Sequence, residues 1–468
     1  MKKEGLPDDF ITQMGNILNE KELFALLDAI VNTSSVTGIR KNPQKGDYLD
    51  IKGRSIPWSK RGITLEKRPN FTLDPSFHAG AYYVQDPSSM LVEWIADKLL
   101  REIQNPSILD LAAAPGGKST LLAEIATEKN GFLLANEVIK SRVPILKQNL
   151  AKWGYSHVFI SSFEVAVFSA LPPIFDLVLL DAPCSGEGLF RKDLQARDEW
   201  SLEHVNHCAS RQKRILSPIA GIIKEGGYLI YSTCTYNQKE NDEQVAWLCQ
   251  HFPFKKVEIE IPETWGIIKT EQGGFQCYPH KVNGEGFYLA VLQLTSGLNQ
   301  VPPEKNSKKA PRTSVSLPES LSTFLKDHHD LVGIQDYSGN YYGIPTVIFP
   351  TFNLLSQYLP FIDPQLKLGS AKGKDFIPEP ELAYSTYLNA DLPKWELDRY
   401  DALVYLKKEK SSIKPPNAGW GLSCYEGMIL GWFKGIGDRY NNYYPKNWRI
   451  LMSLPERINL PALPFPLK

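Results

Sequence analysis

Three side chains able to do covalent chemistry follow two short apolar runs of the sequence. Asp181 and Cys184 come directly after the run Phe175–Leu180, and Cys234 follows the run Tyr228–Tyr231. A single cysteine at the end of a strand is usually a buried filler. Two such cysteines, one of them beside an Asp-Ala-Pro turn, favour a chemical role.

This set of groups fits methylation of a pyrimidine at carbon 5. A thiolate that adds to carbon 6 makes carbon 5 nucleophilic enough to attack a sulfonium methyl group. A carboxyl group near ring nitrogen 3 and the exocyclic amine stabilises charge that develops on the ring. A second group then assists loss of the carbon 5 proton and release of the thiol. We expect Lys118 and a cationic cofactor to favour the thiolate, although residue order alone does not separate the roles of the two cysteines.

A small-residue loop supplies a candidate cofactor site. The run Ile108–Leu111 leads into Ala112-Ala113-Ala114-Pro115-Gly116-Gly117-Lys118, and a helical pattern follows. Small side chains let a ligand approach the backbone, and the amides at a helix start favour an anionic or carboxylate group. Glu137 ends the next apolar run about 20 residues later, where an acidic group accepts from ribose hydroxyls. The pattern predicts a nucleoside cofactor.

Two alternatives remain open. Gly117, Lys118 and Ser119 also fit the end of a P-loop, with Asp181 as the magnesium-binding aspartate, but Ala112 replaces the first glycine of that motif. A P-loop NTPase acting on RNA is therefore a second hypothesis, although a nucleoside triphosphate has little use for Glu137. The third is a non-catalytic RNA-binding assembly factor, which would not need both thiols.

Apolar runs alternating with helical segments predict the elements that position these groups. Alternation of this kind indicates a parallel sheet covered on both faces, and the carboxyl ends of its strands would bring Asp181, Cys184 and Cys234 to one cleft. The run Phe287–Leu294 suits an antiparallel addition. Residues 17–31 carry a helical apolar stripe, and Asp86-Pro87 resembles a helix start. The sequence beyond 415 is rich in glycine and aromatic residues, which suggests a β-rich module.

Length and composition bound the class of protein. The 468 residues suggest roughly three domains, and 43% hydrophobic with 22% charged residues is ordinary for a globular chain. No run approaches the roughly 18 apolar residues of a membrane span, and no signal core follows Met1, so we expect a cytoplasmic protein without a membrane partner. The six cysteines form no CxxC pair, so we expect no metal site and reduced thiols.

The formal net charge is zero, but a basic segment stands out near the N-terminus. Basic residues outnumber acidic ones between Arg40 and Arg68, and Trp58 and Phe71 lie in or beside this segment. We expect it to meet RNA phosphates and its aromatic rings to stack on bases.

Joined motifs give the chain a resemblance to a known family. Tyr83–Met90, Ala112–Lys118, Asp181-Ala182-Pro183-Cys184-Ser185-Gly186 and Ser232-Thr233-Cys234-Thr235 resemble the Sun-type RNA cytosine-5 methyltransferases over about residues 80–297. Glu187–Asp193 and the long C-terminal extension are similar to the bacterial subfamily that methylates a cytosine in the decoding region of 16S rRNA.

The resemblance implies roles for individual residues. Ala112–Lys118 and Glu137 would bind S-adenosylmethionine, and Glu164 would contact its adenine in place of the family's usual aspartate. Asp181 would hold the cytosine near the cofactor. Cys234 would be the nucleophile, and Cys184 would assist release of the covalent adduct.

The resemblance also implies an organisation and a partner. The expected fold is α/β, with a Rossmann-like methyltransferase domain between an N-terminal α/β RNA-binding region and a C-terminal PUA-like module. The expected partner is 16S rRNA or the 30S subunit. The predicted divisions are residues 1–76, 77–297, a linker at 298–318, an intermediate RNA-binding region at 319–400, and the PUA-like module at 401–468.

Overall fold

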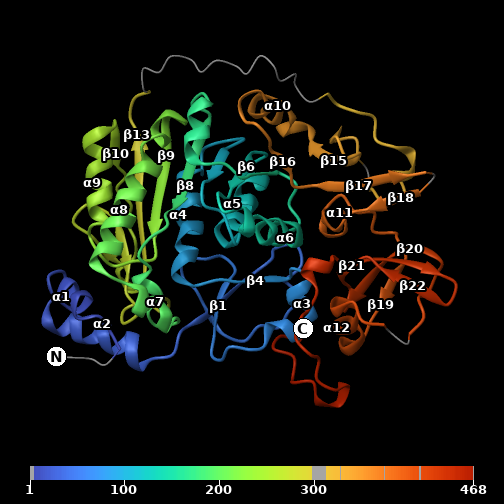
Figure 1. Ribbon diagram of the computed structural model, residues 1–468, viewed down its shortest axis with the longest axis horizontal. Coiled ribbons are helices and arrows are strands. Elements are labelled where there is room, and N and C mark those ends of the chain that lie inside the picture. Colours follow the sequence, from blue (N-terminus) through green and yellow to red (C-terminus); the bar gives the residue numbers. More distant parts are fainter. Residues whose placement is uncertain (1–4, 298–312, 327, 374, 411–412, 467–468) are drawn as a thin grey trace.

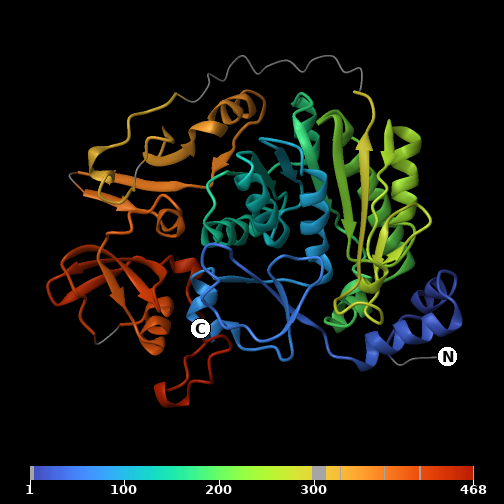
Figure 2. The same ribbon diagram turned by 180° about the vertical axis from the view of Figure 1, so that it is seen from behind.

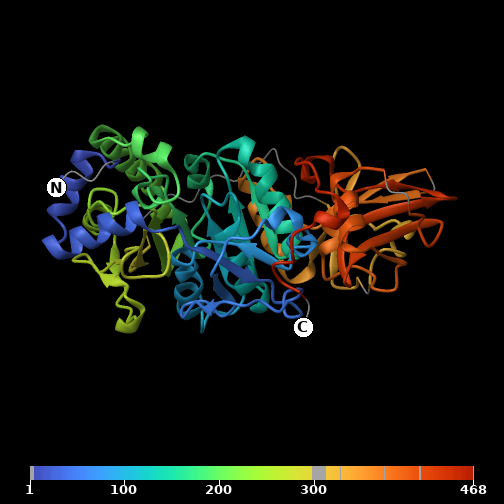
Figure 3. The same ribbon diagram turned by 90° about the horizontal axis from the view of Figure 1, so that it is seen from below.

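The computed structural model describes residues 5–297, 313–326, 328–373, 375–410 and 413–466. Most of the predicted linker, residues 298–312, lies outside these described residues. Figure 3 shows the parts of the chain side by side along an elongated molecule, with the N-terminal helices near one end and the C-terminal sheets near the other. No helix of the described residues is long and apolar enough to cross a membrane.

A mixed sheet forms the centre of the molecule (Figure 1). Its main strands run in the order β13-β9-β8-β5-β6-β7, and five of them are parallel. Their bounds are β5 (Ser107–Asp110), β6 (Phe132–Asn136), β7 (Val158–Ser161), β8 (Phe175–Asp181), β9 (Ile223–Thr233) and β13 (Phe287–Leu294). Strand β13 pairs antiparallel with β9. The predicted parallel sheet and its antiparallel addition are confirmed.

Helices cover both faces of this sheet, because the strands carry apolar side chains on each face. One face packs on α4 (Leu91–Leu99), α5 (Gly117–Glu128) and α6 (Val143–Trp153). The other face packs on α8 (Leu202–Leu216), α9 (Asp242–His251) and α10 (Phe349–Tyr358). Helix α10 comes from the region that follows the predicted linker, and β16 (Asp363–Pro364) pairs with β7. The C-terminal half therefore completes the central domain.

Two helices and a small sheet precede the central domain. Helices α1 (Asp8–Gly15) and α2 (Glu20–Asn32) pack near α7 (Leu194–Glu199) on a cluster that contains Phe190, Trp200 and Tyr236. Asn19 caps α2, so the predicted stripe begins three residues before the helix. The small sheet has the order β2-β3-β1-β4. Its elements are β1 (Thr37–Lys41), β2 (Arg54–Ser55), β3 (Gly62–Leu65) and β4 (Tyr82–Val84), with α3 (Pro75–His78) before β4.

The C-terminal half contains two four-stranded sheets; the second confirms the β-rich module predicted beyond residue 415, and the first was not predicted. The first has β14 (Leu331–Gln335), β15 (Asn340–Pro345), β17 (Lys367–Lys372) and β18 (Asp375–Pro378), and α11 (Pro380–Tyr384) follows. The second has β19 (Lys394–Glu396), β20 (Gly419–Tyr425), β21 (Met428–Ile436) and β22 (Arg439–Asn442), with α12 (Arg399–Lys407). Short strands β10 (Phe254–Lys256), β11 (Ile268–Lys269) and β12 (Phe275–Cys277) extend the central sheet.

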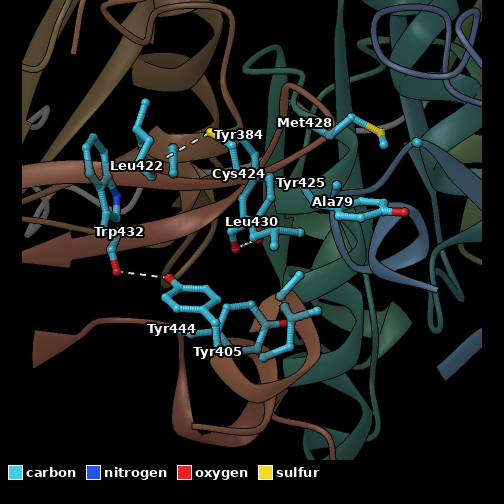
Figure 4. Packing of buried hydrophobic residues seen from close by; sticks show 14 of the residues in the cluster. Ala79, Tyr384, Tyr405, Leu422, Cys424, Tyr425, Met428, Leu430, Trp432 and Tyr444 are labelled. Carbon is cyan, nitrogen blue, oxygen red and sulfur yellow. Dashed lines mark hydrogen bonds between the residues drawn. The ribbon is translucent and has the colours of Figure 1, made fainter. Parts of the chain in front are cut away.

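One hydrophobic core joins the C-terminal sheets to the N-terminal region. Figure 4 shows Tyr384, Tyr405 and Trp432 in this core, with Ala79 from the N-terminal region beside Tyr425 and Met428. The end of the chain runs back beside α3 (Figure 2), where the Asp50 amide donates to the Pro466 carbonyl at 2.8 Å. The N-terminal, central and C-terminal parts thus meet around α3 and α6.

Candidate active site

The small-residue loop joins β5 to α5 at the carboxyl end of the sheet. Its residues are small, as predicted, and Gly116 takes the left-handed conformation with φ of 115° immediately before α5. A side chain at that φ would strain the backbone. Ala112 is half-buried and Pro115 is exposed, whereas Ala113 and Ala114 are buried. The loop therefore presents backbone and small side chains where a ligand can approach.

Glu137 lies directly beside this loop. Its carboxylate is 2% exposed and accepts hydrogen bonds from the backbone amides of Ala114 at 3.2 Å and Ile139 at 2.8 Å. Arg142 donates to the Ala114 carbonyl at 2.6 Å and lies 3.7 Å from the Glu137 carboxylate. Each carboxylate oxygen keeps a further lone pair for another donor. The arrangement can therefore hold the loop and still accept from the hydroxyls of a ribose.

Asn136 was not singled out from the sequence, yet it connects the ends of three strands. Its side-chain amide donates to the carbonyls of Leu111 at 3.2 Å and Phe163 at 3.0 Å, and its oxygen accepts from Ser161 at 2.9 Å. These bonds fix the spacing between the ends of β5, β6 and β7. Its place before Glu137 was the only signal in the sequence.

Glu164 is exposed and precedes the 3-10 turn Val165–Ala170. Among the described residues its side chain makes no hydrogen bond or ion pair, and its backbone carbonyl accepts from Val167 at 3.0 Å. Its contact with an adenine stays a prediction.

Lys118 and Asp181 form an ion pair between the cofactor loop and the end of β8. Lys118 Nζ lies 2.7 Å from Asp181 Oδ2, and Ser232 Oγ donates to Asp181 Oδ1 at 2.8 Å. Burial opposes the charge of Lys118, but Asp181 raises the pKa of the ammonium above its usual value, with a smaller contribution from Cys234. Lys118 therefore stays cationic. Because its ammonium is paired with Asp181, Lys118 is not free to bind a phosphate as the lysine of a P-loop does.

The two cysteines meet beside this ion pair. Cys184 Sγ lies 3.2 Å from Cys234 Sγ, and the Cys234 amide lies 3.4 Å from Cys184 Sγ. Both are free and half-buried. The hydrogen bond with Cys234, together with burial, raises the pKa of Cys184 well above its usual value. Cys184 therefore keeps its proton at neutral pH.

Glu240 is a buried carboxylate that holds the Cys184 loop. It accepts from the Ser185 amide at 3.0 Å, from Ser185 Oγ at 2.5 Å and from Gln212 at 2.9 Å. Gln212 also donates to the Pro183 carbonyl at 3.1 Å. Burial raises the pKa of Glu240, and its hydrogen bonds oppose that effect.

Glu187 does the same for the loop after Cys234. It accepts from the backbone amides of Tyr236 at 2.8 Å and Asn237 at 3.0 Å. The Asn237 side chain connects the two carboxylates, donating to Glu240 at 2.7 Å and to Glu187 at 3.0 Å. Sequence reasoning missed the role of this network, because no spacing rule pairs residues of two separate loops.

The basic segment between Arg40 and Arg68 differs from its predicted role. Arg40 is 2% exposed, donates to Thr120 Oγ1 at 2.6 Å and lies 4.4 Å above the Trp153 ring. Trp58 and Phe71 are also buried, so none of these three side chains is available for RNA. The prediction was wrong for them because charge and aromaticity in a sequence do not report burial. Four basic residues of the segment are exposed and form no ion pair among the described residues, namely Lys52, Arg54, Lys67 and Arg68, although the Arg68 guanidinium lies 5.3 Å from the centre of the Phe71 ring.

Comparisons with known proteins show which families the parts of the chain match. The family model described as 16S rRNA methyltransferase RsmB/F matches residues 98–293. The N-terminal domain of 16S rRNA methyltransferase RsmF matches residues 6–87, and the methyltransferase RsmF PUA domain matches residues 393–450.

Curated relatives share the same description. A ribosomal RNA small subunit methyltransferase F from Klebsiella pneumoniae (strain 342) is 30% identical, with 94% of this chain and 96% of that relative covered. One from Escherichia coli O139:H28 is 34% identical over 64% of this chain, and the chain spans 65% of the length of that relative.

Solved structures share the fold over part of the chain. The protein PH0851 matches with a TM-score of 0.54 and 26% identity, covering 62% of this chain and 66% of that one. NSun6 from Pyrococcus horikoshii, solved with SFG, matches with a TM-score of 0.51 and 19% identity, covering 63% of this chain and 99% of that one.

Proposed function

The chain belongs to the RsmB/F family of 16S rRNA methyltransferases, and we propose that it forms 5-methylcytosine in 16S rRNA through a covalent cysteine intermediate. The observation that supports this most is the 3.2 Å distance between the sulfur atoms of Cys184 and Cys234, beside the carboxylate of Asp181. The substrate would be a decoding-region cytosine, in free rRNA or in the 30S subunit, which assigns the protein to the cytoplasm.

The residues of the loop fit S-adenosylmethionine. Ala112–Lys118 would lie against it, and Glu137 would accept from its ribose hydroxyls, because both oxygens retain accepting capacity. When bound, this cofactor supplies an electrophilic methyl group. Side chains of the protein hold the cytosine and form and break the bond between sulfur and carbon 6.

Cys234 forms a bond from its sulfur to carbon 6 of the cytosine, which raises the electron density at carbon 5. Asp181, held by Lys118 and Ser232, accepts from the exocyclic amine and keeps the ring in place. After carbon 5 is methylated, its proton passes to solvent, the electron pair of that C–H bond re-forms the double bond between carbons 5 and 6, and the sulfur–carbon bond breaks to release the Cys234 thiolate. Cys184 carries its proton 3.2 Å from the departing sulfur, so its thiol stabilises the Cys234 thiolate as it leaves.

Cysteine variants test this division of roles. We expect Cys234→Ala to abolish methyl transfer to 16S rRNA, with affinity for S-adenosylhomocysteine unchanged within about twofold. Cys184→Ala should accumulate a covalent protein–RNA species, visible on a denaturing gel, because addition proceeds and release stalls. Cys249→Ala, outside the site, is the control. Exchanged phenotypes would overturn the roles, and absence of methyl transfer by the unaltered protein would overturn the function itself.

A further inference from the structure

A cavity lies where the N-terminal, central and C-terminal parts of the chain meet. It has a volume of about 250 Å³, and we call it the junction pocket. Its walls come from α3, β4, α6 and the C-terminal Trp448. Figures 1 and 2 show these elements side by side. The lining residues that carry the argument are Phe77, His78, Tyr83, Lys152, Trp153 and Trp448.

Two polar atoms of this lining are buried and have no hydrogen-bond partner among the described residues, and a lysine beside them has no ion pair. Lys152 is 6% exposed and its ammonium makes no hydrogen bond or ion pair there. His78 Nδ1 and Trp153 Nε1 are buried without a hydrogen bond. His78 Nε2 lies 3.0 Å from the Thr72 carbonyl, so Nε2 carries the hydrogen and Nδ1 is an acceptor. The pocket therefore offers two donors and one acceptor.

Unpartnered buried atoms occur elsewhere among the described residues, Asp110 Oδ1 and Glu381 Oε2 included, but Lys152 contrasts with a buried ion pair of the same chain. Arg191 and Glu285, each with a side chain 4% exposed, lie 2.9 Å apart. Lys152 has instead a second ammonium near it, since Lys45 Nζ donates to the Lys152 carbonyl at 2.7 Å. No carboxylate of the described residues pairs with either lysine. A cation without a carboxylate partner lowers stability when it is largely removed from water, so Lys152, with the Lys45 ammonium near it, suits an anion.

The other walls are aromatic. Lys152 Nζ lies 5.9 Å from the centre of the Phe77 ring and 5.6 Å from that of Trp448. Asn149 donates to the Tyr83 hydroxyl at 3.4 Å and to the Pro115 carbonyl at 2.8 Å, so the pocket adjoins the cofactor loop. A cation beside aromatic rings suits a nucleotide, because the cation can bind the phosphate and the rings can stack on the base.

We propose that the junction pocket binds one unstacked nucleotide of the substrate RNA, with its phosphate on Lys152 and its base against the aromatic walls. His78 Nδ1 accepts from an amino group of the base or from the 2′-hydroxyl, and Trp153 Nε1 donates to an acceptor of the same nucleotide. A pocket of this size excludes a paired duplex, so the nucleotide comes from a single-stranded or opened part of the rRNA. The inference rests on the proposed function, because it takes rRNA as the substrate.

Lys152→Met in the full-length protein tests the proposal, with 16S rRNA transcribed in vitro as the probe. We expect the affinity to fall about tenfold, and the slope of log affinity against log salt to decrease by about 0.7 to 0.9, the value of one phosphate contact. The melting temperature should rise, because methionine removes an unpaired buried charge. Affinity for S-adenosylhomocysteine should stay within about twofold. A merely structural lysine would not lower RNA affinity while raising stability.

Lys147→Met is the matched control, because Lys147 lies on the same helix and is paired with Asp363 at 2.5 Å. It should change RNA affinity less than twofold and should not raise the melting temperature. Competition by uridine 5′-monophosphate, uridine and inorganic phosphate distinguishes the sources of the anion. Stronger competition by uridine 5′-monophosphate than by inorganic phosphate supports the proposal. Equal competition by these two compounds overturns it in favour of a simple anion site.

Two further outcomes overturn the proposal separately from the function. If Lys152→Met binds 16S rRNA like the unaltered protein, and the unaltered protein methylates that rRNA, the nucleotide site is wrong and the proposed function stands. If Lys152→Met loses both stability and cofactor affinity, the lysine is structural. Failure of the unaltered protein to methylate 16S rRNA instead counts against the proposed function.

Discussion

The cysteine site and the junction pocket both bury polar side chains, but they treat them in opposite ways. Around the cysteines, the carboxylate of Glu240 accepts from Ser185, Gln212 and Asn237. In the junction pocket, Lys152 and His78 Nδ1 have no such partners among the described residues. In the first arrangement the carboxylate is satisfied within the protein, and Gln212 Oε1 is the one atom of these groups that is buried without a partner among the described residues. In the second arrangement the polar groups gain partners only when a ligand binds.

The difference shows two ways to prepare a site. Reaction geometry must be held to within fractions of an ångström, which favours side chains fixed by fully satisfied hydrogen bonds. A binding pocket can leave donors and acceptors unpaired, because the ligand later satisfies them. Until then the unpaired groups lower the stability of the fold.

Disrupting the hydrogen bonds of Glu240 should have a larger effect on methyl transfer than any change in the junction pocket. We expect Glu240→Gln to lower methyl transfer about 100-fold and to destabilise the fold by about 2–4 kcal/mol. The amide places a donor against the donors of Ser185 and Asn237, so the Cys184 loop shifts. Methyl-transfer rates and urea unfolding measure the two effects.

Glu243→Gln is the control for this variant, because Glu243 lies on α9 and is exposed. It should leave rate and stability unchanged. Unaltered turnover in Glu240→Gln would show that the network does not position the cysteines.

The unpaired Lys152 in the junction pocket should make the stability of the protein depend on pH. Burial lowers the pKa of Lys152 to about 7 from an ordinary 10.5. Between these two values the unfolded chain binds a proton that the folded chain has released, so stability rises with pH across this window. The contribution is on the order of 5 kcal/mol, at about 1.4 kcal/mol per pKa unit. Lys152→Met should therefore be the more stable protein near pH 7, and its advantage should shrink towards pH 10.

Melting temperatures at pH 7 and pH 9.5 measure this difference. Some rise with pH should persist in the variant, because burial also lowers the pKa of Lys45 to about 7. Lys147→Met should follow the unaltered protein at both pH values. Parallel pH profiles for Lys152→Met and the unaltered protein would mean that Lys152 is already satisfied.

The smallest effect should come from basic residues that are paired at the surface. Lys60 lies 3.1 Å from Asp97, and Arg61 lies 2.7 Å from Glu124. Exposed or partly exposed pairs of this kind contribute at most about 1 kcal/mol, and their charge is already neutralised. The double change Lys60→Gln with Arg61→Gln should lower 16S rRNA affinity less than twofold. A tenfold loss of 16S rRNA affinity would show that the basic segment is part of the RNA-binding surface.

Much of the central domain could be predicted because its signals are local. The apolar run Phe287–Leu294 has the bounds of β13, and Asp181, Cys184 and Cys234 meet because parallel strands end at one edge. The assigned roles of these residues and of Glu137 and Glu164 stay predictions. The apolar stripe at 17–31 was less informative, since Asn19 caps the helix and leaves Ile17 and Leu18 outside it.

By itself the sequence determined which chemical groups stand at the ends of the strands, because the order of strands and loops follows from local periodicity. Only the tertiary structure decided what each charge faces. Arg40 and Lys152 are both basic residues, yet one is packed on Thr120, Glu124 and Trp153 and the other has no anionic partner among the described residues. The physical reason is that burial and pairing depend on residues far apart in the chain, which no local pattern encodes.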